Sequence, residues 1–258
     1  MEGRLPNLVP WGVVVWSSAF LFTRRSLPTF SFDFSNRLVS TVHAIVAVSL
    51  ASMSVEDWSS PISPLASKPS PRQETALAVS LAYLIYDLFC CLFDKRVSVD
   101  NAVHHLVSII GIGAGLLYGK CGSEQVAALW ITEISSPFLH LRELLKELGY
   151  RDTGLNLAAD VSRSLFNSIP VFFSSEVHKD VAGLSVGVKQ LAFAATFSLA
   201  RMMGGPYLTY KALSADNPLL IKAMAIGLQL VSAFWFYKIV RMLKYKLSKI
   251  SSSPRKLA

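Results

Sequence analysis

Residues 75–93 read TALAVSLAYLIYDLFCCLF, a run of 19 residues in which Asp87 is the only charged side chain. A helix that crosses the hydrocarbon core of a bilayer needs roughly 17–25 mostly apolar residues, so this run is long enough to span a membrane. The whole chain of 258 residues is 52% hydrophobic and 16% charged, whereas soluble domains carry about 25% charged residues. The sequence therefore indicates a multi-pass membrane protein and argues against a soluble globular protein, a disordered chain or a coiled coil.

Six further apolar blocks surround this run and are separated by short charged clusters. Together they predict an all-α transmembrane helical bundle of about seven spans. The first block is interpreted as a retained span, because Trp11 and Trp16 interrupt the apolar core that a signal peptide would need. The expected spans are Leu8–Phe22, Leu38–Met53, Thr75–Phe93, Ala102–Tyr118, Val126–Leu141, Leu191–Tyr210 and Pro218–Val240.

Two segments do not have the composition of a span. Val55–Gln73 contains four prolines and is rich in serine, which predicts a linker between spans. Residues 161–190 contain several charged side chains, and their removal would join Leu155–Asp160 to Leu191–Tyr210 in one apolar pattern. They can be interpreted as an eighth span, as a surface or re-entrant loop, or as an insertion into an ancestral span.

The net charge of +8 comes mainly from one segment, because residues 238–258 contain seven basic and no acidic side chains. Basic residues that flank membrane spans are favoured on the cytosolic side. We therefore expect a cytosolic carboxyl terminus and, with seven spans, a lumenal amino terminus. The charge does not indicate a nucleic-acid partner. The cysteines Cys90, Cys91 and Cys121 lack the spacing of a zinc site, so no metal and no cofactor are expected.

Ionisable side chains inside the apolar blocks are the residues that point to a function. A charge at membrane depth is costly, so such side chains usually face a protein interior or a polar cavity. These residues are His43, Asp87, His104, His105, Glu133 and Arg201.

The adjacent residues His104 and His105 open one apolar block, and Asp100 lies one helical turn before His104. Neighbouring positions on a helix diverge by about 100°, so the two rings cannot point at one atom. Asp100 and His104 share a helix face, where the carboxylate can fix the imidazole tautomer. The pair is interpreted as a general base or acyl-accepting nucleophile, or else as packing histidines. We expect His104, His105 and Glu133 to face one enclosed polar cavity.

Glu133 precedes Pro137 by four residues, so its carbonyl lacks a helical donor and a kink is predicted there. Ser135 and Ser136 can supply local hydrogen bonds at the kink. The segment is interpreted as one wall of a polar cavity, or as an ordinary proline-kinked helix. For Arg201 we expect a structural ion pair with Glu133, with a lipid phosphate or the membrane interface as alternatives.

Several of these residues occur in an order that resembles the TLC-domain family of multi-pass membrane proteins. The matching residues are Arg37 with His43, Tyr83–Asp87, His104–His105, Glu133–Phe138 with Arg142, and Phe197–Arg201 with Pro206. The resemblance implies six helices around a membrane cavity in residues 37–245, after an additional span in residues 1–36 and before a basic tail in residues 246–258. It favours the insertion interpretation of residues 161–190, because the last two family motifs normally lie closer together.

The resemblance also implies a location in the endoplasmic reticulum and a function with membrane lipids as partners. The expected function is to bind, sense or handle lipids and so contribute to membrane lipid homeostasis. The residues expected to bind lipid or line the cavity are His43, Asp87, Ser135, Ser136, Arg142 and Arg201.

Ceramide synthases, which belong to this family, are similar at His104–His105, and this implies an alternative function. That alternative is acyl transfer from acyl-CoA. The residues that would carry it are His104, His105, Asp100 and Glu133. The chain departs from the ceramide synthases at Thr132, Glu133 and Ser136, where their motif has further acidic residues and a histidine. Lipid handling without catalysis is therefore preferred.

Overall fold

The computed structural model describes residues 5–93, 99–148 and 197–251, and each regular element in these residues is a helix. The all-α prediction is confirmed for this part of the chain. Residues 161–190, for which an insertion is expected, lie outside it. The helices are α1 (Leu5–Ser26), α2 (Phe32–Ser54), α3 (Pro71–Phe93), α4 (Val99–Tyr118), α5 (Gly122–Glu133), α6 (Ser136–Glu147), the π-helix η1 (Ser198–Gly204), α9 (Gly205–Ser214) and α10 (Leu219–Ser251).

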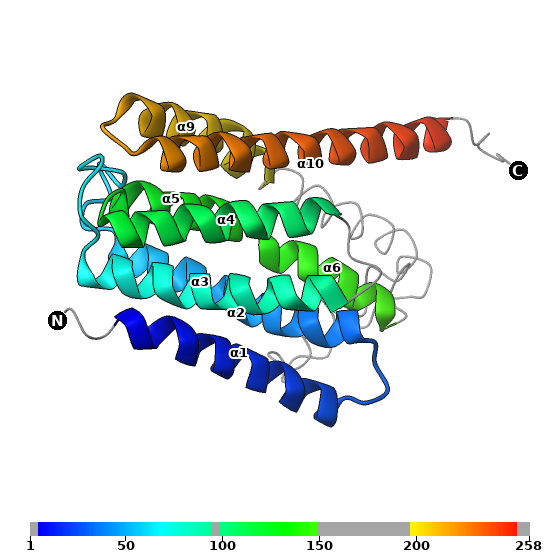
Figure 1. Ribbon diagram of the computed structural model, residues 1–258. Helices are drawn as coiled ribbons and strands as arrows, with labels where there is room; N and C mark the ends of the chain where they lie inside the picture. The colour runs from blue at the N-terminus through cyan, green and yellow to red at the C-terminus, as the bar shows by residue number, and fades with distance from the viewer. Residues whose placement is uncertain (1–4, 94–98, 149–196, 252–258) are drawn as a thin grey trace, which may run out of the picture.

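The helices lie side by side along one common direction, with α1 on one outer side and α9 and α10 on the other (Figure 1). α1 begins at one end of the bundle and α10 finishes at the opposite end. Within the described residues, four helices are long and apolar enough to cross a membrane: α2, α3, α4 and Leu219–Arg241 of α10. The structure is therefore a helical bundle in which several helices have the length and composition of membrane spans.

The expected span Val126–Leu141 is broken in its middle. α5 ends at Glu133, a turn follows, and α6 begins at Ser136. The cause is Pro137, which has no N–H to donate to the Glu133 carbonyl. The predicted kink is thus confirmed. With 12 residues each, α5 and α6 are too short to cross a bilayer separately.

The expected span that ends at Tyr210 is also irregular. Its first residues lie outside the described part of the chain. The rest begins as η1, a π-helix of seven residues, and continues as α9 with Pro206 in the first turn. Arg201 lies in η1 and is buried. Such π-helical segments are rare and are often found at functional sites.

α3 is the central helix and packs against α1, α2, α4 and α5. Fully buried alanines recur on α2 and α3. Ala44, Ala47 and Ala51 of α2 and Ala76, Ala78 and Ala82 of α3 are fully buried. Small side chains let membrane helices approach closely, where dispersion contacts replace the hydrophobic effect as the driving force. The outward faces carry large apolar side chains instead, which is the surface a bilayer requires.

The linker between α2 and α3 is shorter than expected. α3 begins at Pro71, because proline fits the first turn of a helix, so the non-helical segment ends at Ser70 and not at Gln73. Glu124 of α5 holds the linker, because its Oε1 accepts from the Ala66 N–H at 2.7 Å. The same oxygen accepts from Nδ2 of Asn217, in the loop between α9 and α10, at 3.4 Å. One carboxylate thus joins two loops at the same end of the bundle.

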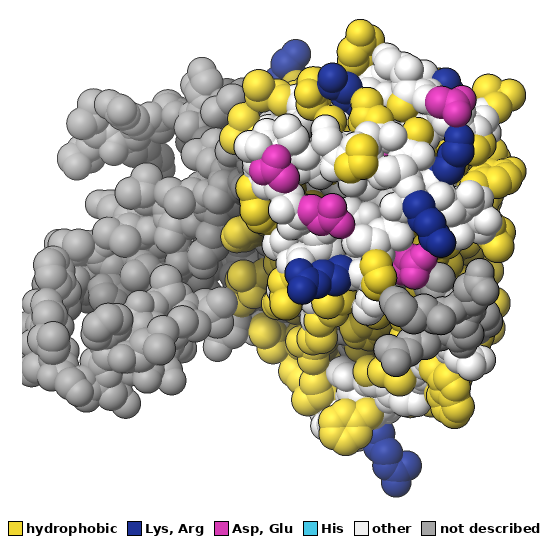
Figure 2. Space-filling view, turned by 90° about the vertical axis from the view of Figure 1, so that its left-hand side faces the viewer, with side chains coloured by type: hydrophobic (Ala, Val, Ile, Leu, Met, Phe, Trp, Pro, Cys, Tyr) yellow, Lys and Arg dark blue, Asp and Glu magenta, His cyan; other side chains and the backbone are white. Residues whose placement is uncertain are grey.

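Charged side chains of both signs gather at this end, and hydrophobic side chains surround them (Figure 2). Lys120 Nζ donates to Asp216 Oδ2 at 3.0 Å and holds the pKa of that carboxyl below its usual value. At the opposite end, α1 finishes with Arg24 and Arg25, and α10 carries Arg241. The end where α10 finishes thus also carries basic residues.

Substitution of Gly12 tests the packing of α1 on α3. A Cβ added at Gly12 would lie 2.6 Å from Cβ of Ala82, whereas one added at Gly113 would meet no atom within 4 Å. We expect Gly12→Ala to lower the free energy of unfolding by about 1–3 kcal/mol, as overpacking does. Gly113→Ala is the matched control and should not lower the melting temperature. Thermal unfolding of the detergent-solubilised protein measures both, and equal shifts would contradict the packing.

Candidate functional site

α4 presents His104 and His105 to different neighbours. The ring of His104 is buried, with its centroid 4.9 Å from that of Trp235 on α10. The ring of His105 faces α3, with Nε2 at 3.4 Å from Asp87 Oδ2. This divergence follows from the angle between adjacent helical positions. The expectation that both histidines share one cavity with Glu133 was therefore wrong for His105, which is not among the residues that line the cavity.

A cavity of about 110 Å³ lies between α4, α5, α9 and α10. Much of its wall is apolar and includes Val107, Ile131 and Leu208. The ionisable side chains that line it, apart from a cysteine, are His104, Glu124, Glu133 and Arg201. The cavity thus combines an apolar wall with a few ionisable side chains, as is usual for a small-molecule site.

A larger hollow of about 730 Å³ adjoins this cavity. It lies between the α2–α3 linker, α5, η1 and α9, and its aromatic lining residues are Trp58, Trp130 and Tyr207. Ile131 and Leu208 line both spaces, so the two are neighbours.

Arg201 is a buried charged residue of the cavity. Its Nη2 donates to the Thr132 carbonyl at 2.5 Å, and its Cζ lies 5.2 Å from the centroid of the Trp235 ring. The expected ion pair with Glu133 is absent from the ion pairs of the described residues. The reason is that α5 ends beside Thr132, so its last carbonyls lack helical donors and accept from Arg201. Nε and Nη1 of Arg201 are buried and have no partner in the described part of the chain.

Asp100 does not orient His104 in the expected way. Its Oδ2 accepts from Trp235 Nε1 and from Lys238 Nζ, so it joins the start of α4 to α10. His104 Nδ1 is buried without a hydrogen-bond partner among the described residues. The rings of His104 and Trp235 are therefore held together by packing, and the imidazole keeps hydrogen-bonding capacity.

A second polar cluster lies between α2 and α3 and centres on Asp87. Asn36 Nδ2 donates to Asp87 Oδ1 at 2.6 Å, and the Tyr83 hydroxyl donates to Oδ2 at 3.1 Å. The Tyr86 hydroxyl donates to Asn36 Oδ1 at 2.7 Å. A buried carboxylate needs such donors, because an unpaired charge in a low-dielectric interior is costly.

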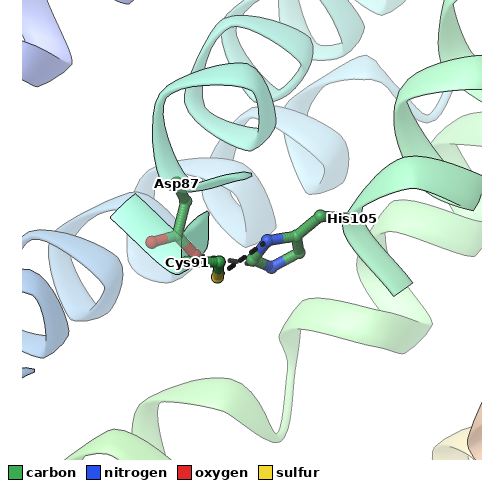
Figure 3. A group of neighbouring side chains, drawn as sticks. All are labelled: Asp87, Cys91 and His105. Carbon is green, nitrogen blue, oxygen red and sulfur yellow. Dashed lines mark hydrogen bonds and ion pairs between the residues drawn. The ribbon is translucent and has the colours of Figure 1, made fainter. Parts of the chain in front are cut away.

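The same carboxylate reaches α4 through His105. Asp87 and Cys91 of α3 and His105 of α4 point toward one another (Figure 3), with Cys91 Sγ at 3.7 Å from His105 Nδ1. One ligand atom from each residue lies within 4.8 Å of the other two. These residue types can bind a metal, although the chain has no zinc-binding motif in its sequence.

The other predicted site residues whose side chains are described do not line the cavity. His43 is fully buried and stacks on Tyr83, with ring centroids 3.6 Å apart. Asp87 lies in the second cluster, Ser135 is buried in the turn before α6, and Ser136 Oγ donates to the Thr132 carbonyl at 3.3 Å. The side chain of Arg142 lies outside the described part of the structure. Of the six residues expected to bind lipid, the structure thus places Arg201 at the cavity.

Sequence reasoning missed Cys91, Asn36 and Gln229. Cys91 follows Asp87 by four residues, which places both side chains on one face of α3. This spacing was the sequence signal that could have paired Cys91 with Asp87. Asn36 precedes Arg37 of the motif but no spacing rule pairs it with Asp87. Gln229 lines the cavity and donates to the Arg201 carbonyl at 3.3 Å, a contact that only the packing of α10 creates.

The Asp87 cluster should stabilise the fold. Tyr86→Phe removes the donor to Asn36 Oδ1, and we expect a loss of about 1–3 kcal/mol in the free energy of unfolding. Tyr237→Phe on α10 is the matched control, because that side chain is 61% exposed. Denaturant or thermal unfolding in detergent compares the two variants. An unchanged Tyr86→Phe protein would show that the cluster contributes no stability.

Comparison with known proteins agrees with this architecture. The family model of the TLC domain matches residues 33–241, which is most of the chain. No solved structure matches the chain. The apolar helices and this match identify an integral membrane protein. The chain belongs to the TLC-domain family.

Proposed function

We propose that the protein binds a membrane lipid between α4, α5, α9 and α10 and so takes part in lipid handling. The observation that carries the proposal is the cavity of about 110 Å³, whose largely apolar wall contains Arg201 and His104. A lipid is the ligand class that combines an apolar chain with an oxygen-rich polar group. The membrane supplies such ligands directly to a site among membrane helices.

The unpaired polar nitrogens of the cavity indicate how the polar group is held. Two guanidinium nitrogens of Arg201 and Nδ1 of His104 are buried without partners in the described residues. A phosphate, carboxylate or carbonyl oxygen of a lipid would accept from Arg201, and charge-assisted hydrogen bonds of this kind are strong. The bound lipid thus satisfies groups that are costly to leave unpaired.

The volumes indicate where the chain lies. A cavity of about 110 Å³ is smaller than a typical ligand pocket of about 300–1,000 Å³, so it accepts only part of a lipid. The adjoining hollow of about 730 Å³ has the size for an acyl chain and the aromatic lining of Trp58, Trp130 and Tyr207. The proposed lipid places its polar group beside Arg201 and its chain past Ile131 and Leu208.

Acyl transfer is the second candidate. It is favoured by one arrangement, in which His104 and Glu133 line the same cavity. In that arrangement His104 would act as the base and His105, which faces α3, would not. Detection of an acylated product after addition of acyl-CoA would distinguish acyl transfer from lipid binding alone.

Substitution of Arg201 tests lipid binding. We expect Arg201→Gln to reduce the lipid that copurifies with the protein by about tenfold, because hydrogen bonds to a charged group contribute about 1.5–3 kcal/mol. Lys222→Gln, on α10 and away from the cavity lining, is the control. Ala128→Leu fills the cavity from α5 and should have the same effect.

Mass spectrometry of extracted lipid, normalised to folded protein, provides the measurement. Addition of acyl-CoA and a long-chain amine or alcohol to the same samples tests acyl transfer. Unchanged bound lipid in both cavity variants, with normal melting temperatures, would reject the proposed site.

We further infer that the protein lies in the endoplasmic reticulum membrane with the end of α10 in the cytosol. The support is the run of seven basic and no acidic residues in 238–258, with Arg24 and Arg25 at the end of the bundle where α10 finishes, since basic flanks are retained in the cytosol. Protease treatment of intact microsomes should remove a tag after Ala258 and spare a tag before Met1. Protection of both tags, or loss of both, would contradict an odd number of spans.

A further inference from the structure

A thiol, an imidazole and a carboxylate meet where α3 ends and α4 begins (Figure 3). Asp87 and Cys91 lie one turn apart on α3, and His105 lies in the second turn of α4. Cys91 Sγ is 3.7 Å from His105 Nδ1, and Asp87 Oδ2 is 3.4 Å from His105 Nε2. The two nitrogens of a single ring therefore have different partners.

The partners of the ring determine its tautomer. An ionised carboxylate only accepts hydrogen bonds, so Asp87 Oδ2, 3.4 Å from Nε2, favours the tautomer of His105 that carries its proton on Nε2. Nδ1 then has the lone pair and faces the Cys91 thiol, which can donate to it. The order thiol, imidazole, carboxylate is that of a nucleophile, its base and the group that orients the base.

The carboxylate is itself held in place. Asn36 Nδ2 donates to Oδ1 of Asp87 at 2.6 Å, and the Tyr83 hydroxyl donates to Oδ2 at 3.1 Å. Side chains of α2 and α3 thus fix Asp87, and Asp87 fixes the ring on α4. Asn36, Tyr83 and Asp87 are positioning residues, whereas Cys91 and His105 contact the reacting atoms.

The surroundings of the thiol indicate its substrate. Cys91 is half-buried, whereas its neighbour Cys90 is only 7% exposed. The end of α3 around it exposes Phe89, Leu92 and Phe93 by 56–80%, so a long apolar chain can approach through the bilayer. A thiol beside a base reacts with an activated carbonyl group. A long-chain acyl thioester combines that group with such a chain.

We propose that Cys91 accepts the acyl group of a long-chain acyl thioester, with His105 as the general base and Asp87 orienting it. The Cys91 proton passes to Nδ1 of His105, and the sulfur attacks the carbonyl carbon of the thioester. The bond from that carbon to the departing sulfur breaks, and the departing thiolate takes the proton back from His105. One thioester is exchanged for another without oxidation or reduction. The site lies outside the lipid cavity, and the inference does not depend on the function proposed for that cavity.

The test uses the full-length protein in lipid nanodiscs with alkyne-labelled palmitoyl-CoA. We expect label on the Cys91 peptide that neutral hydroxylamine removes, which is diagnostic of a thioester. Cys91→Ser should abolish this label. Cys90→Ser, the matched control for the adjacent buried thiol, should retain it.

Substitution of the base and its orienting group tests the mechanism. General base catalysis contributes about 10²–10⁴-fold, so His105→Gln should slow acylation at least about tenfold. Asp87→Asn should lower the maximal acylation rate while the thioester concentration for half-maximal rate stays unchanged. Acylation rates are compared between variants that have the same melting temperature. For any other variant, the rate is corrected for the folded fraction of the protein.

Three outcomes would overturn the inference. Equal acylation rates in His105→Gln would show that the thiol reacts without the base. Label distributed between Cys90 and Cys91 would show unselective chemistry. Absence of label, together with one equivalent of bound Zn²⁺ that protects Cys91 from iodoacetamide, would identify the cluster as a metal site.

Discussion

The carboxylate of Asp87 is the constraint around which this bundle is arranged. A charge in the apolar interior must be surrounded by donors, and Asn36 from α2 and Tyr83 from α3 supply them, while the His105 ring of α4 lies 3.4 Å away. The helices that supply these donors can occupy only one rotation about their axes if the contacts are to form. The alanines of α2 and α3 then allow the close approach that the hydrogen bonds require.

α4 separates two polar sites that differ in character. The face with His104 borders the cavity, where nitrogen atoms of Arg201 and of the imidazole itself are unpaired among the described residues. The face with His105 borders the Asp87 cluster, in which polar groups contact one another. Adjacent residues thus serve two separate environments, because a helix turns by about 100° between them. A cavity with spare donors suits a ligand, whereas the second cluster suits chemistry at its own thiol.

The sequence predicted the helices well and their partners poorly. The apolar runs and Pro137 gave the all-α class and the break between α5 and α6, because both depend on local composition. The pairings of Asp100 with Trp235 and Lys238, and of Arg201 with Thr132, depend on how distant helices pack. No spacing along the chain encodes such contacts. Charge alone predicted Glu133 as the partner of Arg201, but the carbonyl exposed by the helix break lies closer to the guanidinium.

The length of α10 extends the molecule beyond its apolar part. The apolar span covers Leu219–Arg241, yet the helix continues to Ser251 and thus rises about 15 Å further at 1.5 Å per residue. Arg241 and Lys244 lie at the base of this extension and are exposed. A helix that continues beyond its apolar span leaves the hydrocarbon core, so these basic residues are suited to contact lipid headgroups. Basic residues near an anionic leaflet contribute about 1 kcal/mol each, so contact with such a leaflet would make the hold on α10 depend on lipid composition.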